Sequence, residues 1–158
     1  MNVLPPPDLM ALQRALTAQL LQAGRHWRRC AERELESYGI SEACAAPLLW
    51  AGRLGGGVRQ VTLASHVGIE GPSLVRLLDQ LAAAALIERR DDPTDRRAKT
   101  IWLTAAGEAL AARIEDMLVG VRARVLAGFD RADLEAALRV LTAFDETSVR
   151  PAEEEALP

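Results

Sequence analysis

The chain has 158 residues, of which 49% are apolar, and a formal net charge of −3. A chain of this length can bury one core, with or without dimerising extensions. Its apolar run from Leu81 to Ile87 is far shorter than the roughly 18 residues that cross a bilayer, and the start MNVLPPPDLM lacks the basic and apolar regions of a secretory signal. We therefore expect a cytoplasmic protein that is not bound to a membrane.

The negative charge is concentrated at the C-terminal end. From Glu146 to Pro158 the chain has four acidic residues and one arginine, a net charge of −3, so residues 1–145 are neutral overall. A neutral average permits a basic face. The acidic total therefore does not exclude a nucleic-acid partner.

The two cysteines, Cys30 and Cys44, stand fourteen residues apart, without a C-x-x-C pair or a histidine at ligand spacing. This spacing argues against a zinc site and against a disulfide framework. We expect both cysteines to be small buried apolar residues. The sequence predicts no metal and no cofactor.

The first predicted element is a long amphipathic helix, which Asp8 can cap and Gly39 can close. Its apolar residues recur at steps of three and four, the period of one helix face. They are Leu9, Leu12, Leu16, Leu20, Ala23, Trp27 and Cys30. The spacing places Trp27 on the stripe that faces the core.

A second helix is predicted after Ser41, a good N-cap, and it continues to Leu54 with Pro47 as a kink or a later start. Three glycines, Gly55 to Gly57, end it. They lack the spacing of a phosphate-binding loop and follow no predicted strand. We interpret them as a hinge.

A helix-turn-helix is predicted between Gln60 and Ile87. A short helix over residues 60–67 turns Leu63 and Ala64 inward, Gly68 permits a left-handed turn, and a second helix begins near Gly71-Pro72. Leucines hold this second helix to the core: Leu74, Leu77, Leu78 and Leu81. Polar residues remain on or near its outer face: Ser73, Arg76, Asp79 and Gln80.

A β-hairpin is predicted next, with strands over residues 86–90 and 99–103 and an eight-residue loop that contains a turn signal at Asp92-Pro93. After a helix-turn-helix, such a hairpin is a wing. Its tip carries Asp95, Arg96 and Arg97. The carboxylate of Asp95 can pair with the arginine guanidinium groups and direct them outward. Taken alone, the segment also fits a solvated hairpin with weak ion pairs.

Two more helices are predicted before the C-terminus. Thr104 can cap the first, and Asp130, after Gly128, can cap the second. The first has a stripe of Leu110, Ile114, Met117, Val121 and Val125, and the second has Leu134, Leu138 and Leu141. Long amphipathic helices at both ends carry more apolar surface than so small a centre covers, which predicts a homodimer.

The predicted fold is mainly α-helical with a small β-hairpin wing, a winged helix-turn-helix with N- and C-terminal dimerisation helices. The N-terminal dimerisation arm covers residues 1–40 and the winged helix-turn-helix covers 41–104. Dimerisation helices cover 105–147, and a mobile acidic tail covers 148–158.

The stretch GIEGPSLVRLLDQLAAAALIERRDDPTDRRAKTIWLTAAGEAL resembles the MarR family of bacterial transcriptional regulators, most closely its SlyA branch. The specific motifs are PSLVR-x-LDQL and D-R-R-A-K-x-I-x-LT. The resemblance is strong over about residues 60–110, and the flanking helices match only in order, length and an R-x-W-R at Arg25 to Arg28. Pro47 and the three glycines depart from the SlyA-like pattern. The resemblance implies that residues 41–104 bind double-stranded DNA.

The resemblance implies that the helix with PSLVR enters the major groove. Ser73 and Arg76 would contact phosphate and base edges, Pro72 would shape the approach, and Thr62 on the preceding helix would reach a phosphate. An arginine suits this role because it can bind the O6 and N7 atoms of guanine together.

In the wing, the resemblance implies that Arg97 enters the minor groove, with Asp95 orienting it and Arg96 on the flanking backbone. A narrow A·T-rich minor groove has an enhanced negative potential that attracts an arginine side chain. A two-fold dimer then predicts a pseudo-palindromic operator with half-sites about one helical turn apart, roughly 34–36 Å.

Members of this family commonly respond to small aromatic acids or phenolics in a pocket between the dimer arms and the winged domain. Such a ligand needs apolar walls and a cation for its carboxylate, which four residues could supply: Arg25, His26, Trp27 and Trp50. Another branch senses peroxide through a cysteine. A redox-active Cys30 is therefore an alternative, which requires a positive group close to its thiolate.

Two rival classes are weighed against a DNA-binding regulator. An enzyme needs a base held against its partner, yet the chain has only His26 and His66 and no hydrolase, metalloprotease or dinucleotide-binding motif, so we expect no catalytic residues. A winged helix that binds only protein is the second rival. It would not need exposed arginines at positions 76, 96 and 97.

Overall fold

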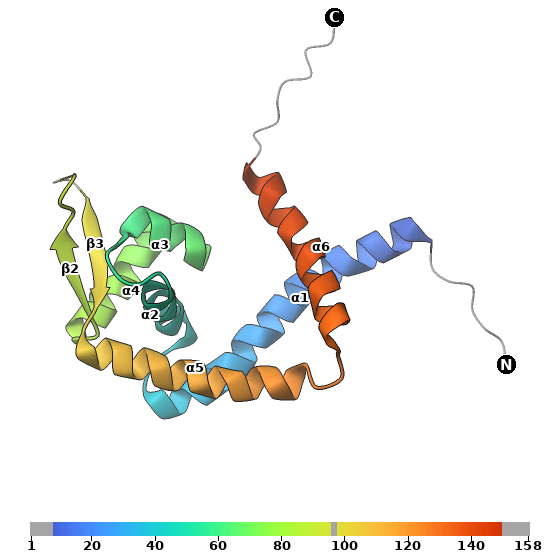
Figure 1. The fold of residues 1–158 in the computed structure, drawn as a ribbon, viewed down its shortest axis with the longest axis horizontal. Helices are drawn as coiled ribbons and strands as arrows, with labels where there is room; N and C mark the ends of the chain where they lie inside the picture. Colours follow the sequence, from blue (N-terminus) through green and yellow to red (C-terminus); the bar gives the residue numbers. More distant parts are fainter. Residues whose placement is uncertain (1–7, 96–97, 150–158) are drawn as a thin grey trace, which may run out of the picture. The chain divides into compact units, whose positions relative to one another are not determined.

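The computed structural model describes residues 8–95 and 98–149, and the chain divides into two compact units, one ending at Val121 and one beginning at Arg122. The first unit contains a winged helix-turn-helix built from three helices and a small antiparallel sheet (Figure 1). None of the helices within the described ranges combines the length and the apolar character that a membrane span needs.

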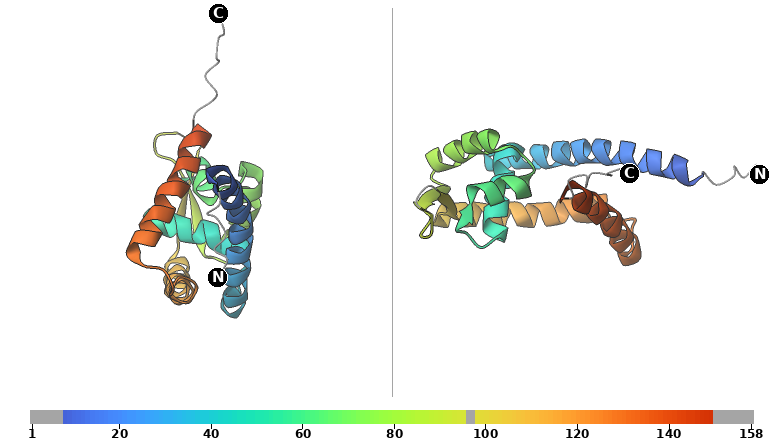
Figure 2. Two further views of the ribbon diagram at one scale, coloured as in Figure 1. Left: turned by 90° about the vertical axis from the view of Figure 1, so that its right-hand side faces the viewer. Right: turned by 90° about the horizontal axis from the view of Figure 1, so that it is seen from above.

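Helix α1 runs from Leu9 to Leu35 and begins where predicted, because the Asp8 carboxylate accepts a hydrogen bond from the backbone N–H of Ala11 at 2.6 Å. A 3₁₀ turn, η1 (Glu36–Tyr38), follows it, and Gly39 closes the turn at φ +69°. The N-terminal half of α1 extends away from the helix-turn-helix (Figure 2).

The predicted burial of the α1 stripe is wrong within a single chain. Of α1, only Ala31 and Leu35 are buried, whereas Trp27 is 36% exposed and Leu9 is 71% exposed. The thiol of Cys30 is likewise exposed, although Cys44 is buried as predicted. The periodic pattern identified one apolar face of this helix, but the core of the same chain covers only its last turn and a half.

The helix-turn-helix matches the prediction closely. Helix α2 (Glu42–Arg53) keeps Pro47 inside it and packs against α3 (Gln60–Val67) and α4 (Gly71–Ala83). Gly68 closes α3 at φ +73°, where a glycine has no steric penalty. The side chains that join the three helices are almost completely buried: Leu48, Ala51, Leu63, Leu74, Leu78 and Leu81.

The sheet has three strands in the order β1-β3-β2, not two. Strands β2 (Ile87–Asp91) and β3 (Lys99–Leu103) form the predicted hairpin, and β1 (Val58–Arg59) adds an unpredicted strand beside β3. Ile101 is fully buried at the centre of the sheet. The sheet therefore fixes the start of α3 to the wing, a link that a two-stranded hairpin would lack.

The glycines before β1 make room for a tryptophan. Gly55, Gly56 and Gly57 all have positive φ, between +65° and +81°, and the indole of Trp102 lies against Gly56 and Gly57. A Cβ atom at Gly57 would lie 2.7 Å from the Trp102 ring. The segment is therefore a tightly packed turn into β1, in contrast to the predicted hinge.

Helix α5 (Ala105–Val125) begins where Thr104 caps it, since its Oγ1 accepts a hydrogen bond from the N–H of Gly107 at 3.0 Å. Its buried side includes Ile114, Leu118 and Val121, but Val125 of the predicted stripe is 53% exposed.

The second unit contains α6 (Arg131–Val149), which begins after a reciprocal cap between Asp130 and Asp133. The predicted cap at Asp130 is thus confirmed. Leu138 and Leu141 on α6 are 62% and 41% exposed.

Candidate nucleic-acid interface

The outer face of α4 presents the predicted contact residues to solvent. Glu70 precedes the helix, Pro72 occupies its first turn, and Pro72, Ser73 and Arg76 are all exposed. A proline is tolerated there because its missing N–H would have no partner within the helix. The Arg76 guanidinium makes no hydrogen bond or ion pair to any residue that the structure describes, so its fork is available to a ligand.

An ion pair ties the base of the wing to α4. From β2, Arg89 donates from Nη1 to the Asp79 carboxylate at 2.6 Å and from Nη2 to the carbonyl oxygen of Val75 at 3.2 Å. Arg89 is on the sheet face that packs against α4. These bonds fix the direction of the wing relative to the outer face of α4.

A second ion pair ties the wing loop to the start of α3. Arg59 of β1 donates from Nε to the Asp92 carboxylate at 2.7 Å and from Nη2 to the hydroxyl of Thr94 at 3.0 Å. Asp92 also accepts hydrogen bonds from the N–H groups of Thr94 at 2.8 Å and Asp95 at 3.1 Å. The turn predicted at Asp92-Pro93 is therefore held by its own aspartate, which is 6% exposed.

The charges of this pair stabilise each other. The hydrogen bond from Arg59, followed by those from Thr94, holds the pKa of Asp92 well below its ordinary value. The same hydrogen bond raises the pKa of Arg59. Both groups are therefore charged at neutral pH, and their ion pair holds the loop.

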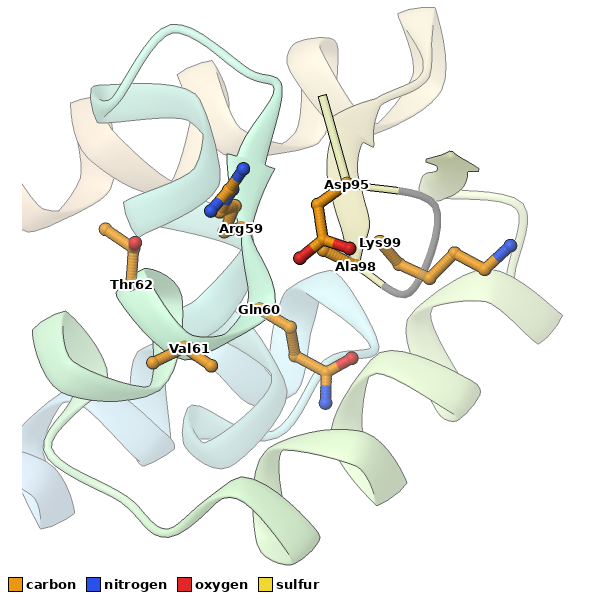
Figure 3. A pocket seen from close by; sticks show the side chains of 7 residues that line it. All are labelled: Arg59, Gln60, Val61, Thr62, Asp95, Ala98 and Lys99. Atoms are coloured by element: carbon orange, nitrogen blue, oxygen red, sulfur yellow. The ribbon is translucent and has the colours of Figure 1, made fainter. Parts of the chain in front are cut away.

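An open groove of about 560 Å³ lies between the first turn of α3 and the wing loop (Figure 3). Of the predicted DNA contacts, it brings together Thr62 from α3 and Asp95 from the wing. The other side chains that line it are Arg59, Gln60, Val61, Ala98 and Lys99. Pro72, Ser73 and Arg76 lie separately, on α4. The predicted contacts Arg96 and Arg97 lie outside the described residues.

Sequence reasoning missed Arg59, Arg89 and the anchoring role of Asp92. The only signal for Asp92 was its position before a proline, which marks a turn without naming a partner. Arg59 and Arg89 are ordinary charged residues in the sequence, and only the pairing of strands shows which carboxylates they meet.

The four predicted ligand-binding residues are not gathered into one described pocket. Arg25, His26 and Trp27 lie on the exposed part of α1. The half-buried ring of Trp50 on α2 instead stacks on His66 of α3, with ring centroids 4.9 Å apart and an interplanar angle of 29°. The guanidinium of Arg53 lies 5.2 Å from the centre of the Trp50 ring.

Comparisons with known proteins agree with this architecture. A family model described as "MarR family" matches residues 38–98. The structure of the transcriptional regulator PA3341 is similar over 84% of this chain and 96% of its own, with 37% sequence identity and a TM-score of 0.78.

Two solved complexes with DNA share the fold. The S. aureus MepR–DNA complex is similar over 84% of this chain and 96% of its own, with 21% identity and a TM-score of 0.72. A mutant MarR from E. coli in complex with operator DNA is similar over 87% of this chain and 99% of its own, with 18% identity and a TM-score of 0.74.

Proposed function

The chain belongs to the MarR family of transcriptional regulators, and on that premise we propose that it acts as a homodimer on a pseudo-palindromic DNA operator. The observation that carries this proposal is the exposed guanidinium of Arg76 on α4, which has no partner among the described residues and lies beside a wing that two ion pairs hold in place. A rigid helix and wing can meet two neighbouring grooves of one duplex at once. The sequence motifs of residues 71–104 favour a SlyA-like member.

The roles of the contact residues follow from the grooves they reach. Arg76 reads a guanine in the major groove, Ser73 and Thr62 bind phosphates, and Pro72 sets the approach of the helix. In the wing, Arg97 enters the minor groove, Arg96 meets the flanking backbone, and Asp95 orients Arg97. Such a regulator works in the cytoplasm, where its operator is.

Dimerisation uses the helices at both chain ends, residues 1–40 and 105–147, around the DNA-binding domain at 41–104. Support for this comes from apolar side chains that α1 and α6 each expose. On α1 they include Leu9, Met10, Leu12, Leu16 and Leu21, and on α6 they include Leu138 and Leu141. Exposed apolar stripes of this kind mark surfaces that bind a protein partner. A two-fold pair places two wings and two α4 helices on one operator.

The Arg76→Ala variant tests the base-reading role. We expect it to lose about 1–3 kcal/mol on the operator, roughly five- to 150-fold in affinity, and much less on random DNA, because a lost base contact affects only the matching sequence. The measurement is a titration of the full-length protein against a duplex selected from a random pool and against an unselected duplex. Arg139→Ala, an exposed arginine on α6, is the control. An equal loss on both duplexes would show that Arg76 binds a phosphate.

A small aromatic carboxylate or phenolic compound releases the protein from DNA, and Trp50 supplies a contact to it. Arg25, His26 and Trp27 share no described pocket with Trp50, so they would contribute only where a second copy of the chain completes the site. The half-exposed ring of Trp50 offers the apolar wall that such a ligand needs, and Arg53, which lies over the ring and pairs with Glu115, adds a positive group beside it. We expect benzoate or 4-hydroxybenzoate to release bound duplex and to quench tryptophan fluorescence, with both effects lost in Trp50→Leu. Release that persists in Trp50→Leu would exclude this site.

A further inference from the structure

Arg59 is held in an unusual way for an exposed arginine. The buried carboxylate of Asp92 and the hydroxyl of Thr94 fix its Nε and Nη2 groups at 2.7 and 3.0 Å, while 48% of its side chain remains exposed. These bonds leave the other N–H donors of the guanidinium without a partner among the residues that the structure describes. We propose that Arg59 is a DNA-backbone contact that Asp92 positions to bind a phosphate in the groove between α3 and the wing.

The place of Arg59 in the groove fits this role. Figure 3 shows Arg59 and Thr62 on the α3 side of the groove, with Asp95, Ala98 and Lys99 on the wing side. A phosphate on the α3 side can accept hydrogen bonds from the guanidinium of Arg59 and the hydroxyl of Thr62 together. On that side it also stays away from Asp95, the acidic side chain of the lining.

The chemistry favours a phosphate over a base. A guanidinium binds phosphate with two parallel hydrogen bonds, and a buried carboxylate behind it lowers the entropy lost when that geometry forms. The groove lies between the first turn of α3, the helix before the major-groove helix α4, and the wing, which would enter the minor groove. The DNA strand that separates a major groove from the adjacent minor groove presents only its sugar-phosphate backbone at that position. The inference therefore rests on the proposed function, and it adds a residue that neither the motifs nor the family resemblance assigned.

The salt dependence of DNA binding tests whether the positive charge of Arg59 contacts a phosphate. Log affinity falls linearly with log salt concentration. With an unselected duplex of about 30 base pairs, we expect Arg59→Gln to make this slope less steep by about 0.9 for each bound copy. Arg59→Lys keeps the charge and should keep most of the slope. Arg139→Gln, the same change at an exposed arginine of α6, should leave it at the wild-type value. A slope for Arg59→Gln equal to that of the wild type would overturn the contact.

Ethylation interference on a selected duplex separates a contact from a purely structural link. If Arg59 binds a phosphate, ethylation of one phosphate per half-site should weaken the wild type but not Arg59→Gln, while all other positions interfere as before. In Asp92→Asn, ethylation of that same phosphate should reduce binding less than it does in the wild type, because the guanidinium of Arg59 is then less well held.

If Arg59 and Asp92 only hold the wing in place, one of two other patterns will appear. Either ethylation will weaken Arg59→Gln at every phosphate that matters for the wild type, or all the phosphates contacted by the wing will lose their effect together. Both patterns would overturn the inference. Thermal melting of both variants checks that they are folded. A wild-type protein that binds neither duplex would instead contradict the proposed function itself, so the two failures are distinguishable.

Discussion

The Gly107→Ala variant is expected to be strongly destabilised. Gly107 is buried in the first turn of α5, and a Cβ atom there would overlap the backbone carbonyl oxygen of Leu86. That oxygen also accepts a hydrogen bond from the N–H of Thr104 at 3.1 Å, so neither backbone can move away freely. We expect a loss of about 3 kcal/mol or more in the free energy of unfolding, which lowers the melting temperature by roughly 10 °C.

Circular dichroism during urea or thermal unfolding measures this effect. Gly128→Ala is the matched control, because no heavy atom lies within 4 Å of a Cβ atom built at Gly128, and its φ is not in the left-handed region. We expect Gly128→Ala to stay within about 1 kcal/mol of the wild type. If Gly107→Ala unfolds like the control, α5 does not begin against the turn between α4 and β2.

The Leu138→Glu variant is expected to be monomeric and to lose operator binding by a factor of about 10² to 10⁴. Leu138 is 62% exposed on α6, and a carboxylate there cannot be buried at a subunit interface without a charged partner. A monomer binds each half-site separately and loses the advantage of two linked contacts.

Sedimentation equilibrium and titration of a selected duplex measure both effects on the same sample. Arg139→Glu places the same side chain on another face of α6 and should leave a dimer. A Leu138→Glu protein that still sediments as a dimer would reject α6 as part of the interface.

Local signals explain why the helix-turn-helix was predicted well. Its helices begin and end at residues whose preference depends only on their neighbours: Ser41 as a cap, Gly68 in a left-handed turn and Pro72 in a first turn. Leucine spacing then identified the buried side of α4. Each of these features can be read within one or two helical turns of the chain.

Strand β1 could not be predicted, because two residues show no periodicity and their partner strand lies about forty residues further along the chain. A separation of 33 residues likewise hid the ion pair between Arg59 and Asp92. The exposure of Trp27 and Cys30 was missed for a different reason. An apolar stripe shows that a helix face needs a partner, but the sequence does not say whether the same chain or a second copy covers it.

The central claim is that two copies of this chain set paired α4 helices and wings on successive turns of one duplex. Hydroxyl-radical footprinting of a selected duplex, with the mass of the same complex measured by sedimentation, tests it most directly. We predict two copies per duplex and protections related by a two-fold axis, with half-site centres about one helical turn apart, roughly 34–36 Å. A single copy on one unbroken protected segment, without two-fold symmetry, would contradict the claim.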